Sequence, residues 1–204
     1  MKNLIKILII CSFISCKAQT IEGYEGKCAG YNSNTYYNDI NNRLNHYEGT
    51  WKYQNGNEIL LIKLRKVLNT RTNGSTEDIL IGEYKYIDNA GVEKINTLSA
   101  FNTNNTDQTF HAIYVHCIDN FSKPVCDICD PNIKRILGMF SDPNKNIAGS
   151  MYMGKTMVGS DEAIQMYLIS DGNQVTNNSP DGLDLQFTYV GVTIKKGWYT
   201  LIKQ

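Results

Sequence analysis

Tyr47-Glu48-Gly49-Thr50-Trp51-Lys52-Tyr53 is the stretch of sequence that decides the fold. It places a glycine, one spacer residue and a tryptophan at the start of a run that alternates like a β-strand. The chain before this stretch is typical of an export signal and a tether, and the chain after it predicts antiparallel strands. We therefore expect Gly49 and Trp51 to be structural residues that start the first long strand and close one end of the domain.

The composition fits one globular domain. Of the 204 residues, 42% are apolar and 20% are charged, which is enough to build a core of its own. The 20 basic residues equal the 20 acidic ones and form no block, so we expect no binding to nucleic acid. The 13 tyrosines, with abundant Asn, Gly and Thr, favour strands and turns over helices.

Alternating runs fill the chain after Trp51. In residues 58–68, Leu60, Ile62 and Leu64 share one face while Lys63 and Arg65 share the other. Further runs, separated by turn signals, cover residues 78–88, 92–98, 109–117, 133–140, 147–154, 163–170, 183–192 and 197–203. With about nine or ten short strands and no helix-length insert, the sequence predicts an all-β fold, an antiparallel meander that closes into a β-barrel of about 8–10 strands. We assign residues 46–204 to this domain.

Residues 1–15 predict a signal peptide, which is excluded from the fold. Lys2 and Lys6 precede a short apolar core at 7–14, and Ser15-Cys16 resembles a bacterial lipobox. We expect Cys16 to be acylated and to anchor the chain in a membrane. Lys17 at the next position favours the outer membrane. The alternative is cleavage after Ala18, which would give a soluble secreted chain.

Residues 16–45 are polar and are predicted to form a tether. Within them Tyr36, Ile40 and Leu44 recur at four-residue spacing, which predicts a short helix with one apolar stripe just before Gly49. The alternative is irregular chain with chance spacing.

Four cysteines remain for the exported chain: Cys28, Cys117, Cys126 and Cys129. An even number in an oxidising compartment predicts disulfides, and three pairings stay open. The Cys-x-x-Cys sequence lies in a proline-flanked loop, so neither a redox site nor a structural metal site is expected.

No catalytic motif stands out, and we expect neither an enzyme nor a cofactor. His111 and His116 fall on opposite faces of a strand, and the residues from Asp142 to Asn146 make a turn rather than a calcium loop. Many tyrosines fall within strands. They would either stack against a sugar in a shared cavity or fill the core with their hydroxyls at its rim.

Two resemblances rest on particular residues. The signal end Ser15-Cys16-Lys17-Ala18-Gln19, the Gly49-Thr50-Trp51 stretch, the loop at 124–129 and the closing residues 196–204 together resemble a family of uncharacterised flavobacterial (Bacteroidota) lipoproteins, defined as a domain of unknown function. That resemblance implies an envelope location and a shared fold. A short helical turn leading into Gly-x-Trp is similar to the lipocalins, in which an arginine from a late strand lies across the tryptophan. Here the late strands offer Lys195, Lys196 and Lys203.

The sequence as a whole predicts an exported, lipid-anchored protein of the cell envelope, monomeric and attached to the outer membrane through its N-terminal lipid. The first hypothesis for its function is a lipocalin-like barrel that binds a small apolar or sugar-like ligand. The second is a structural or interaction protein with a solid barrel that contacts cell-wall polymer or a partner protein.

Overall fold

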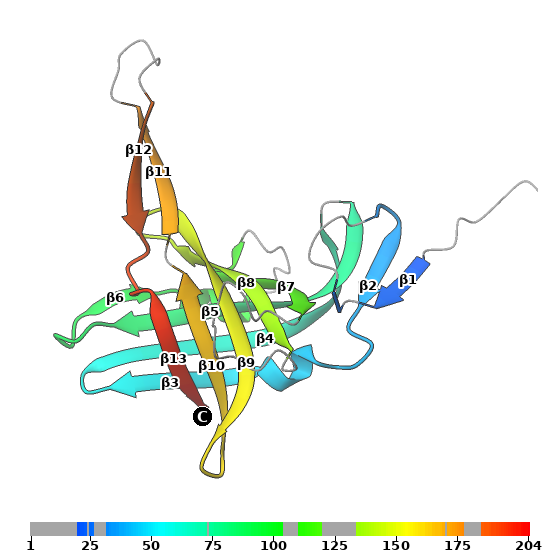
Figure 1. Cartoon of the computed structure of the whole chain (residues 1–204), viewed down its shortest axis with the longest axis horizontal. Helices are drawn as coiled ribbons and strands as arrows, with labels where there is room; N and C mark the ends of the chain where they lie inside the picture. Colours follow the sequence, from blue (N-terminus) through cyan, green and yellow to red (C-terminus); the bar gives the residue numbers. More distant parts are fainter. Residues whose placement is uncertain are drawn as a thin grey trace, which may run out of the picture.

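Eight antiparallel strands close into a barrel in the computed structural model of the chain (Figure 1). The structure describes residues 20–23, 25–26, 32–72, 74–103, 110–119, 134–169, 171–177 and 185–204. The predicted all-β fold and the closed meander are confirmed. Among the described residues, no helix has the length and apolar character needed to cross a bilayer.

The barrel strands follow one another around the wall in the order β5, β4, β3, β13, β10, β9, β8 and β7, and β7 pairs with β5 to close it. Their bounds are β3 (Gly49–Asn55), β4 (Glu58–Thr72), β5 (Ser75–Ile87), β7 (Ile113–Asp119), β8 (Arg135–Asp142), β9 (Ile147–Val158), β10 (Asp161–Ile169) and β13 (Gly197–Lys203). Closure leaves the wall without a free edge, which removes the usual hazard of edge-to-edge aggregation.

The remaining elements decorate this wall. They are β1 (Thr20–Gly23), β2 (Thr35–Asn38), β6 (Glu93–Asn96), β11 (Asp171–Asn177), β12 (Leu185–Gly191) and the 3-10 helices η1 (Leu44–Tyr47) and η2 (Leu98–Asn102). β6 pairs with β5, and β11 with β12 forms a separate two-stranded sheet. β2 pairs in parallel with β5 and carries β1 on its other side.

The predicted helix over residues 36–44 is wrong. Residues Thr35–Asn38 form β2, and the only helical turn near them is η1, which begins at Leu44. Tertiary partners override the four-residue spacing: the Tyr36 hydroxyl donates to Asp78 on β5 at 2.6 Å. The Asp39 carboxylate then accepts the backbone N–H groups of Arg43 and Leu44, which turns the chain into η1.

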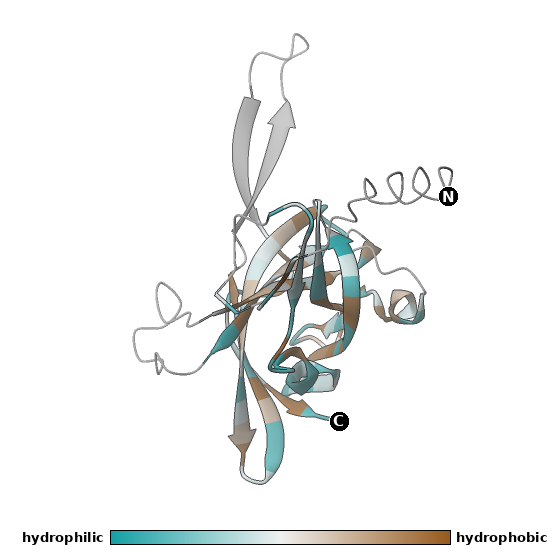
Figure 2. Cartoon of the chain, turned by 90° about the vertical axis from the view of Figure 1, so that its right-hand side faces the viewer, coloured by the Kyte–Doolittle hydropathy of each residue, from teal (hydrophilic) through white to brown (hydrophobic). Residues whose placement is uncertain are grey.

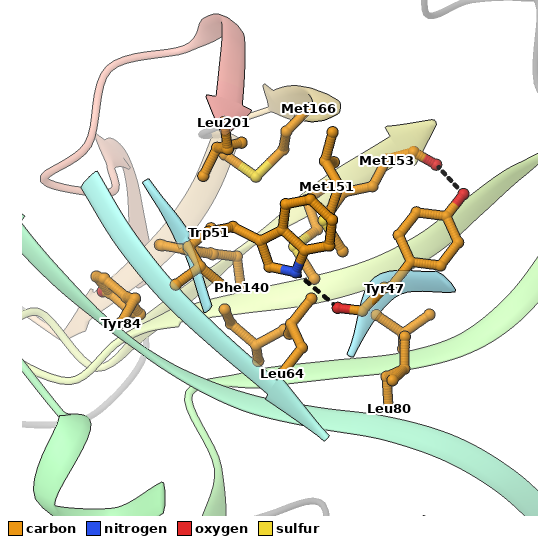
Figure 3. Packing of buried hydrophobic residues seen from close by; sticks show 14 of the residues in the cluster. Tyr47, Trp51, Leu64, Leu80, Tyr84, Phe140, Met151, Met153, Met166 and Leu201 are labelled. Carbon is orange, nitrogen blue, oxygen red and sulfur yellow. Dashed lines mark hydrogen bonds between the residues drawn. The ribbon is translucent and has the colours of Figure 1, made fainter. Parts of the chain in front are cut away.

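Apolar side chains fill the interior of the barrel. Leu60, Ile62 and Leu64 belong to the buried core, as their alternation predicts, together with Phe140 and Met166 from other strands. Each of these five is at most 2% exposed. Figure 3 shows how Leu64, Phe140 and Met166 lie in this core. A side chain that bordered a water-sized void would keep accessible surface, so the interior around these residues is packed solid. Figure 2 shows the corresponding alternation of apolar and polar bands along the strands.

Trp51 is buried within this core, next to η1. It is 0% exposed, and its indole N–H donates to the carbonyl of Tyr47 in η1 at 2.7 Å (Figure 3). The Tyr47 hydroxyl in turn donates to the Met153 carbonyl on β9 at 3.3 Å, so η1 is fastened across the barrel end. The Lys203 ammonium lies 5.5 Å from the centre of the indole ring.

Gly49 and Gly82 meet different needs of the backbone. Gly49 has φ +123°, a conformation that L side chains rarely adopt, where the chain leaves η1 and starts β3. At Gly82, a Cβ would lie 2.4 Å from the Lys63 carbonyl, so only glycine allows β4 and β5 to approach so closely. The Gly82 position also pairs with Ile113 of β7, at the seam that closes the barrel.

A carboxylate fastens the N-terminal segment to the barrel. The Gly26 N–H donates to the Ile118 carbonyl on β7 at 2.8 Å, and the Glu25 side chain pairs with Arg43 and Lys134. Burial raises the pKa of Glu25, but hydrogen bonds from Lys134, Arg43 and Asn41 outweigh it and hold that pKa at about 2. This part of the predicted tether is therefore held against the wall of the barrel.

Candidate functional site

A cleft of about 440 Å³ lies outside the barrel, where the β8–β9 turn meets η2 and the residues before β7. Its floor follows the register of the wall: the Ser141 N–H donates to the Ala112 carbonyl at 2.8 Å, and Ser141 pairs with Ala148 of β9. Thr97 and Phe110 stand at its sides. We name it the Phe110 cleft, after its exposed aromatic side chain.

A buried acid–base pair underlies the Phe110 cleft. The His111 ring nitrogen Nδ1 lies 2.9 Å from a Glu83 carboxylate oxygen, and these side chains are 0% and 1% exposed. Glu83 is on the outer face of β5, whereas His111 precedes β7, so the pair ties the two segments together next to the seam. With so little surface, the pair offers no atom to a bound molecule and serves to fasten the cleft wall.

Asp142 is the second buried acid of the cleft. One carboxylate oxygen accepts the Asn144 N–H at 3.0 Å and holds the β8–β9 turn, as the Asp142-to-Asn146 sequence predicts. The other accepts the Thr193 N–H at 2.7 Å, from the segment that leads into β13. Asp142 is 0% exposed, so its charge is used within the fold and not presented to solvent.

Tyr84 connects the barrel interior to the floor of the cleft. Its ring packs on Phe140 with centroids 4.1 Å apart, and its hydroxyl donates to the Ser141 carbonyl at 2.9 Å. Burial, followed by the nearby charges of Asp142 and Glu83, raises the pKa of Tyr84 well above its usual range. The phenol therefore stays protonated and acts as a fixed donor.

The accessible surface of the Phe110 cleft is therefore uncharged. Phe110 is 64% exposed and presents an aromatic face. Thr97 and Ser141 are half-buried, while Pro143 and Asn146 are exposed. The lining combines one aromatic ring, small apolar surfaces and hydroxyl and amide groups.

The strand tyrosines do not gather in a shared cavity. Tyr84, Tyr86 and Tyr199 belong to the packed core and use their hydroxyls at its rim, where Tyr86 donates to Glu58 and Tyr199 to the Lys195 carbonyl. These three tyrosines therefore fill the β core, whereas Tyr114 lies in a small cluster outside the barrel. The side chain of Tyr189 lies outside the described residues.

Of the predicted cysteines, the structure describes Cys117. Cys117 is buried on β7, while Cys16, Cys28, Cys126 and Cys129 lie outside the described residues, so acylation and disulfide pairing stay predictions. Within the described ranges, no three His, Cys, Asp or Glu side chains gather closely enough to hold a metal ion.

Sequence reasoning missed the cleft. The sequence predicts that His111 lies in a strand and Asp142 in a turn. Nothing in it links either residue to Glu83, which is 28 residues from His111. The one available signal was the acid Glu83 within the otherwise uncharged strand run of residues 79–84.

The chain belongs to a family of unknown function, DUF6705, whose family model matches residues 1–204. No curated protein and no solved structure matches it.

Proposed function

We propose that this member of the DUF6705 family is an exported, lipid-anchored protein of the bacterial envelope that binds a neutral, sugar-like ligand in the Phe110 cleft and catalyses no reaction. The observation that carries the proposal is the cleft itself, an external hollow whose accessible lining is uncharged and whose ionisable groups are all buried and partnered. The barrel serves as a rigid support that acts as a monomer.

The packed interior favours an external site over a lipocalin-like one. Eight-stranded barrels either fill with their own side chains or hold one ligand. Here Leu60, Trp51 and Met166 are 0% exposed, so a ligand inside would have to displace the core. An apolar ligand in the lumen is accordingly disfavoured, and the sugar-like ligand is assigned to the outside of the wall.

The lining chemistry supports a sugar. A pyranose ring has an apolar face that stacks on an aromatic side chain and hydroxyls that both donate and accept hydrogen bonds. Phe110 supplies the ring, and Thr97, Ser141 and Asn146 supply neutral partners. Because the cleft exposes no charge of its own, a charged ligand would lose hydration without gaining a counter-ion.

Catalysis is disfavoured by the same burial. A general base must come within hydrogen-bonding reach of its substrate. The His111 imidazole is 0% exposed, and both Asp142 oxygens already accept backbone N–H groups. These groups stabilise the site and are poorly placed to transfer protons.

The anchor rests on the sequence. Ser15-Cys16 follows an apolar signal core, and Lys17 favours the outer membrane. Export to an oxidising compartment agrees with a disulfide between Cys117 and one of Cys28, Cys126 and Cys129. Cys16→Ser should release the protein from the membrane fraction, and unchanged membrane association would refute the anchor.

Ligand binding is tested by calorimetry with a panel of neutral oligosaccharides and matched oligosaccharides that carry uronic acids. We expect a neutral sugar to bind and Phe110→Ala to weaken its binding about two- to tenfold, because an aromatic stacking contact contributes about 0.5–1.5 kcal/mol. Met157→Ala, another exposed apolar side chain at the far end of β9, is the matched control and should bind normally. Equal loss in both variants, or preference for the charged sugars, would refute the assignment.

The second candidate is a structural or interaction protein, and the solid barrel is the observation that favours it. Native mass spectrometry of protein purified from its own host separates the two. A retained sugar mass that disappears in Phe110→Ala supports ligand binding, whereas a co-purified protein that survives this substitution supports the interaction role.

A further inference from the structure

We propose that the face of the N-terminal sheet that carries Ile21, Ile40 and Leu68 lies on the surface of the bilayer that holds the lipid anchor. This inference rests on the proposed acylation of Cys16. It adds an orientation: the chain is not suspended on a long tether, because its first strand is docked on the barrel four residues after the anchor.

The N-terminal sheet extends beyond the barrel. β2 pairs in parallel with β5 through Tyr36↔Thr76 and Tyr37↔Glu77, and β1 pairs with β2 from Thr20 to Gly23. Figure 1 places β1 and β2 at one end of the long axis, beside the far ends of β4 and β5.

Large apolar side chains are exposed on this sheet. Ile21, Ile40 and Leu68 are 63%, 61% and 62% exposed. Ile21 and Gly23 lie on the same face of β1, and a Cβ on Gly23 would lie 3.6 Å from the Ile40 Cδ1 atom, so Ile40 lies over β1. Leu68 borders a surface depression with Asn42, close to the same turn.

A hydrogen-bond network holds this face rigid. The Asp39 N–H donates to the Asp78 carboxylate at 3.0 Å, and the Asp39 carboxylate accepts the Lys66 ammonium at 2.9 Å. The Asn69 N–H also donates to Asp78, at 3.1 Å. Ile40 and Leu68, next to Asp39 and Asn69 in the chain, are therefore held in place in an exposed position and are not part of a fraying end.

The anchor brings this face to the membrane. Three residues lie between Cys16 and Thr20 at the start of β1, and the four steps along the chain reach at most about 14 Å when fully extended. The interfacial layer on each side of a bilayer is roughly 5–7 Å thick. A Cys16 acylated in that layer therefore holds β1 close to the headgroups, where exposed isoleucine and leucine side chains are stabilised by contact with the acyl boundary.

Apolar contact, not charge, is the recognition chemistry. Arg43 and Lys134 are both paired with Glu25, and Lys66 is paired with Asp39. These three cations are thus engaged within the fold, whereas Arg71, which pairs with Thr76 of β5 next to β2, is exposed. We expect this face to dock on zwitterionic lipid as well as on anionic lipid.

The test uses the full acylated chain in vesicles of phosphatidylcholine with brominated acyl chains, and in matched vesicles that also contain phosphatidylglycerol. Ile40→Trp adds a reporter on the proposed face. Val92→Trp is the control, because Val92 is 49% exposed and precedes β6, which lies at the opposite end of the long axis (Figure 1). Emission above that of the wild-type chain is expected to be quenched at least twofold for Ile40→Trp and to stay unchanged for Val92→Trp, in both kinds of vesicle.

The two failures are distinguishable. A chain that does not float with the vesicles overturns the anchor and this inference together. A chain that floats but shows equal, weak quenching at both positions overturns the orientation alone. A concentration-dependent blue shift of Ile40→Trp emission without quenching identifies the face as a contact between copies of the chain, and this too overturns the proposal.

Discussion

The two faces of β5 are both buried, yet different interactions stabilise them. On the inner face, Leu80 and Tyr84 pack against the apolar core of the barrel. On the outer face, Glu83 is as deeply buried as they are, but it depends on one specific partner, His111. The inner face tolerates any set of apolar side chains of the right volume, whereas a buried acid on the outer face needs a matched polar partner.

Glu77, another buried acid on the outer face of β5, follows the same rule. Glu77 accepts the Tyr114 hydroxyl at 3.0 Å, while Ile79, Ile81 and Tyr114 form a small apolar cluster of their own outside the barrel. Burial on this side comes from elements added to the wall and not from closure of the barrel. Removing one side chain should therefore be costly on either face. The compensating substitution differs: an apolar side chain of similar volume restores the inner face, whereas both partners must be replaced together on the outer face.

The largest effect is expected from the inner face. Trp51→Ala should lower the free energy of unfolding by about 3–5 kcal/mol, because it empties the closed end of the core and frees the Tyr47 carbonyl. Trp198→Ala is the matched control, since Trp198 is 40% exposed and stacks only partly on Tyr167, and should cost about 0.5–1 kcal/mol. Urea denaturation measures both, and equal costs would show that Trp51 does not close the core.

The next effect concerns the outer face. His111→Ala should cost about 1–3 kcal/mol, because it leaves the Glu83 carboxylate buried without its partner. The exposed His46, changed to Ala, should cost about 0.5 kcal/mol or less. Replacing the pair with Glu83→Leu and His111→Leu should recover part of the loss, and a double variant less stable than His111→Ala would contradict pairwise dependence.

A smaller effect is expected where the last barrel strand, β13, pairs with the first, β3. Lys203→Met keeps the length of the side chain but removes its charge both from over the Trp51 ring and from the ion pair with Glu162, and should cost about 0.5–1 kcal/mol in all. Lys203→Arg should retain the contact. Lys195→Met changes an exposed residue just before β13 and should leave the stability unchanged. Thermal unfolding measures the stability of the three variants. If Lys203→Met is as stable as Lys195→Met, the contact of Lys203 with the Trp51 ring contributes no stability.

The smallest effect depends on pH. Because the pKa of Glu25 is about 2 in the folded chain and 4.5 is its ordinary value, its contribution is present above pH 4.5 and is lost as the pH falls toward 2. The pair is partly exposed to solvent, so this contribution is about 0.5 kcal/mol. Glu25→Gln should remove this contribution, so the difference in unfolding free energy from the wild type should shrink from pH 6 to pH 2 in denaturant titrations. A difference that stays constant would argue against stabilisation by the ion pairs of Glu25 with Arg43 and Lys134.

Much of the fold was predictable because one-sided burial leaves a period of two in the sequence. The period of two at Leu60, Ile62 and Leu64 predicts which side of their strand is buried, and the Gly49–Trp51 spacing marks where the first barrel strand begins. The helix over residues 36–44 failed because Tyr36 and Asp39 find their partners on β5 and β4, where local spacing carries no information. The Phe110 cleft was missed for the same reason, since its parts come from β5, the start of β7 and the β8–β9 turn.

The sequence by itself determined the all-β class and the inward faces of the strands, because apolar burial is set by each strand alone. Only the tertiary structure decided which acids are buried, that Lys203 lies over Trp51 and that the N-terminal strands dock beside β5. Those features depend on pairs of residues far apart in the chain, and a pairing energy exists only once the barrel has brought its partners together.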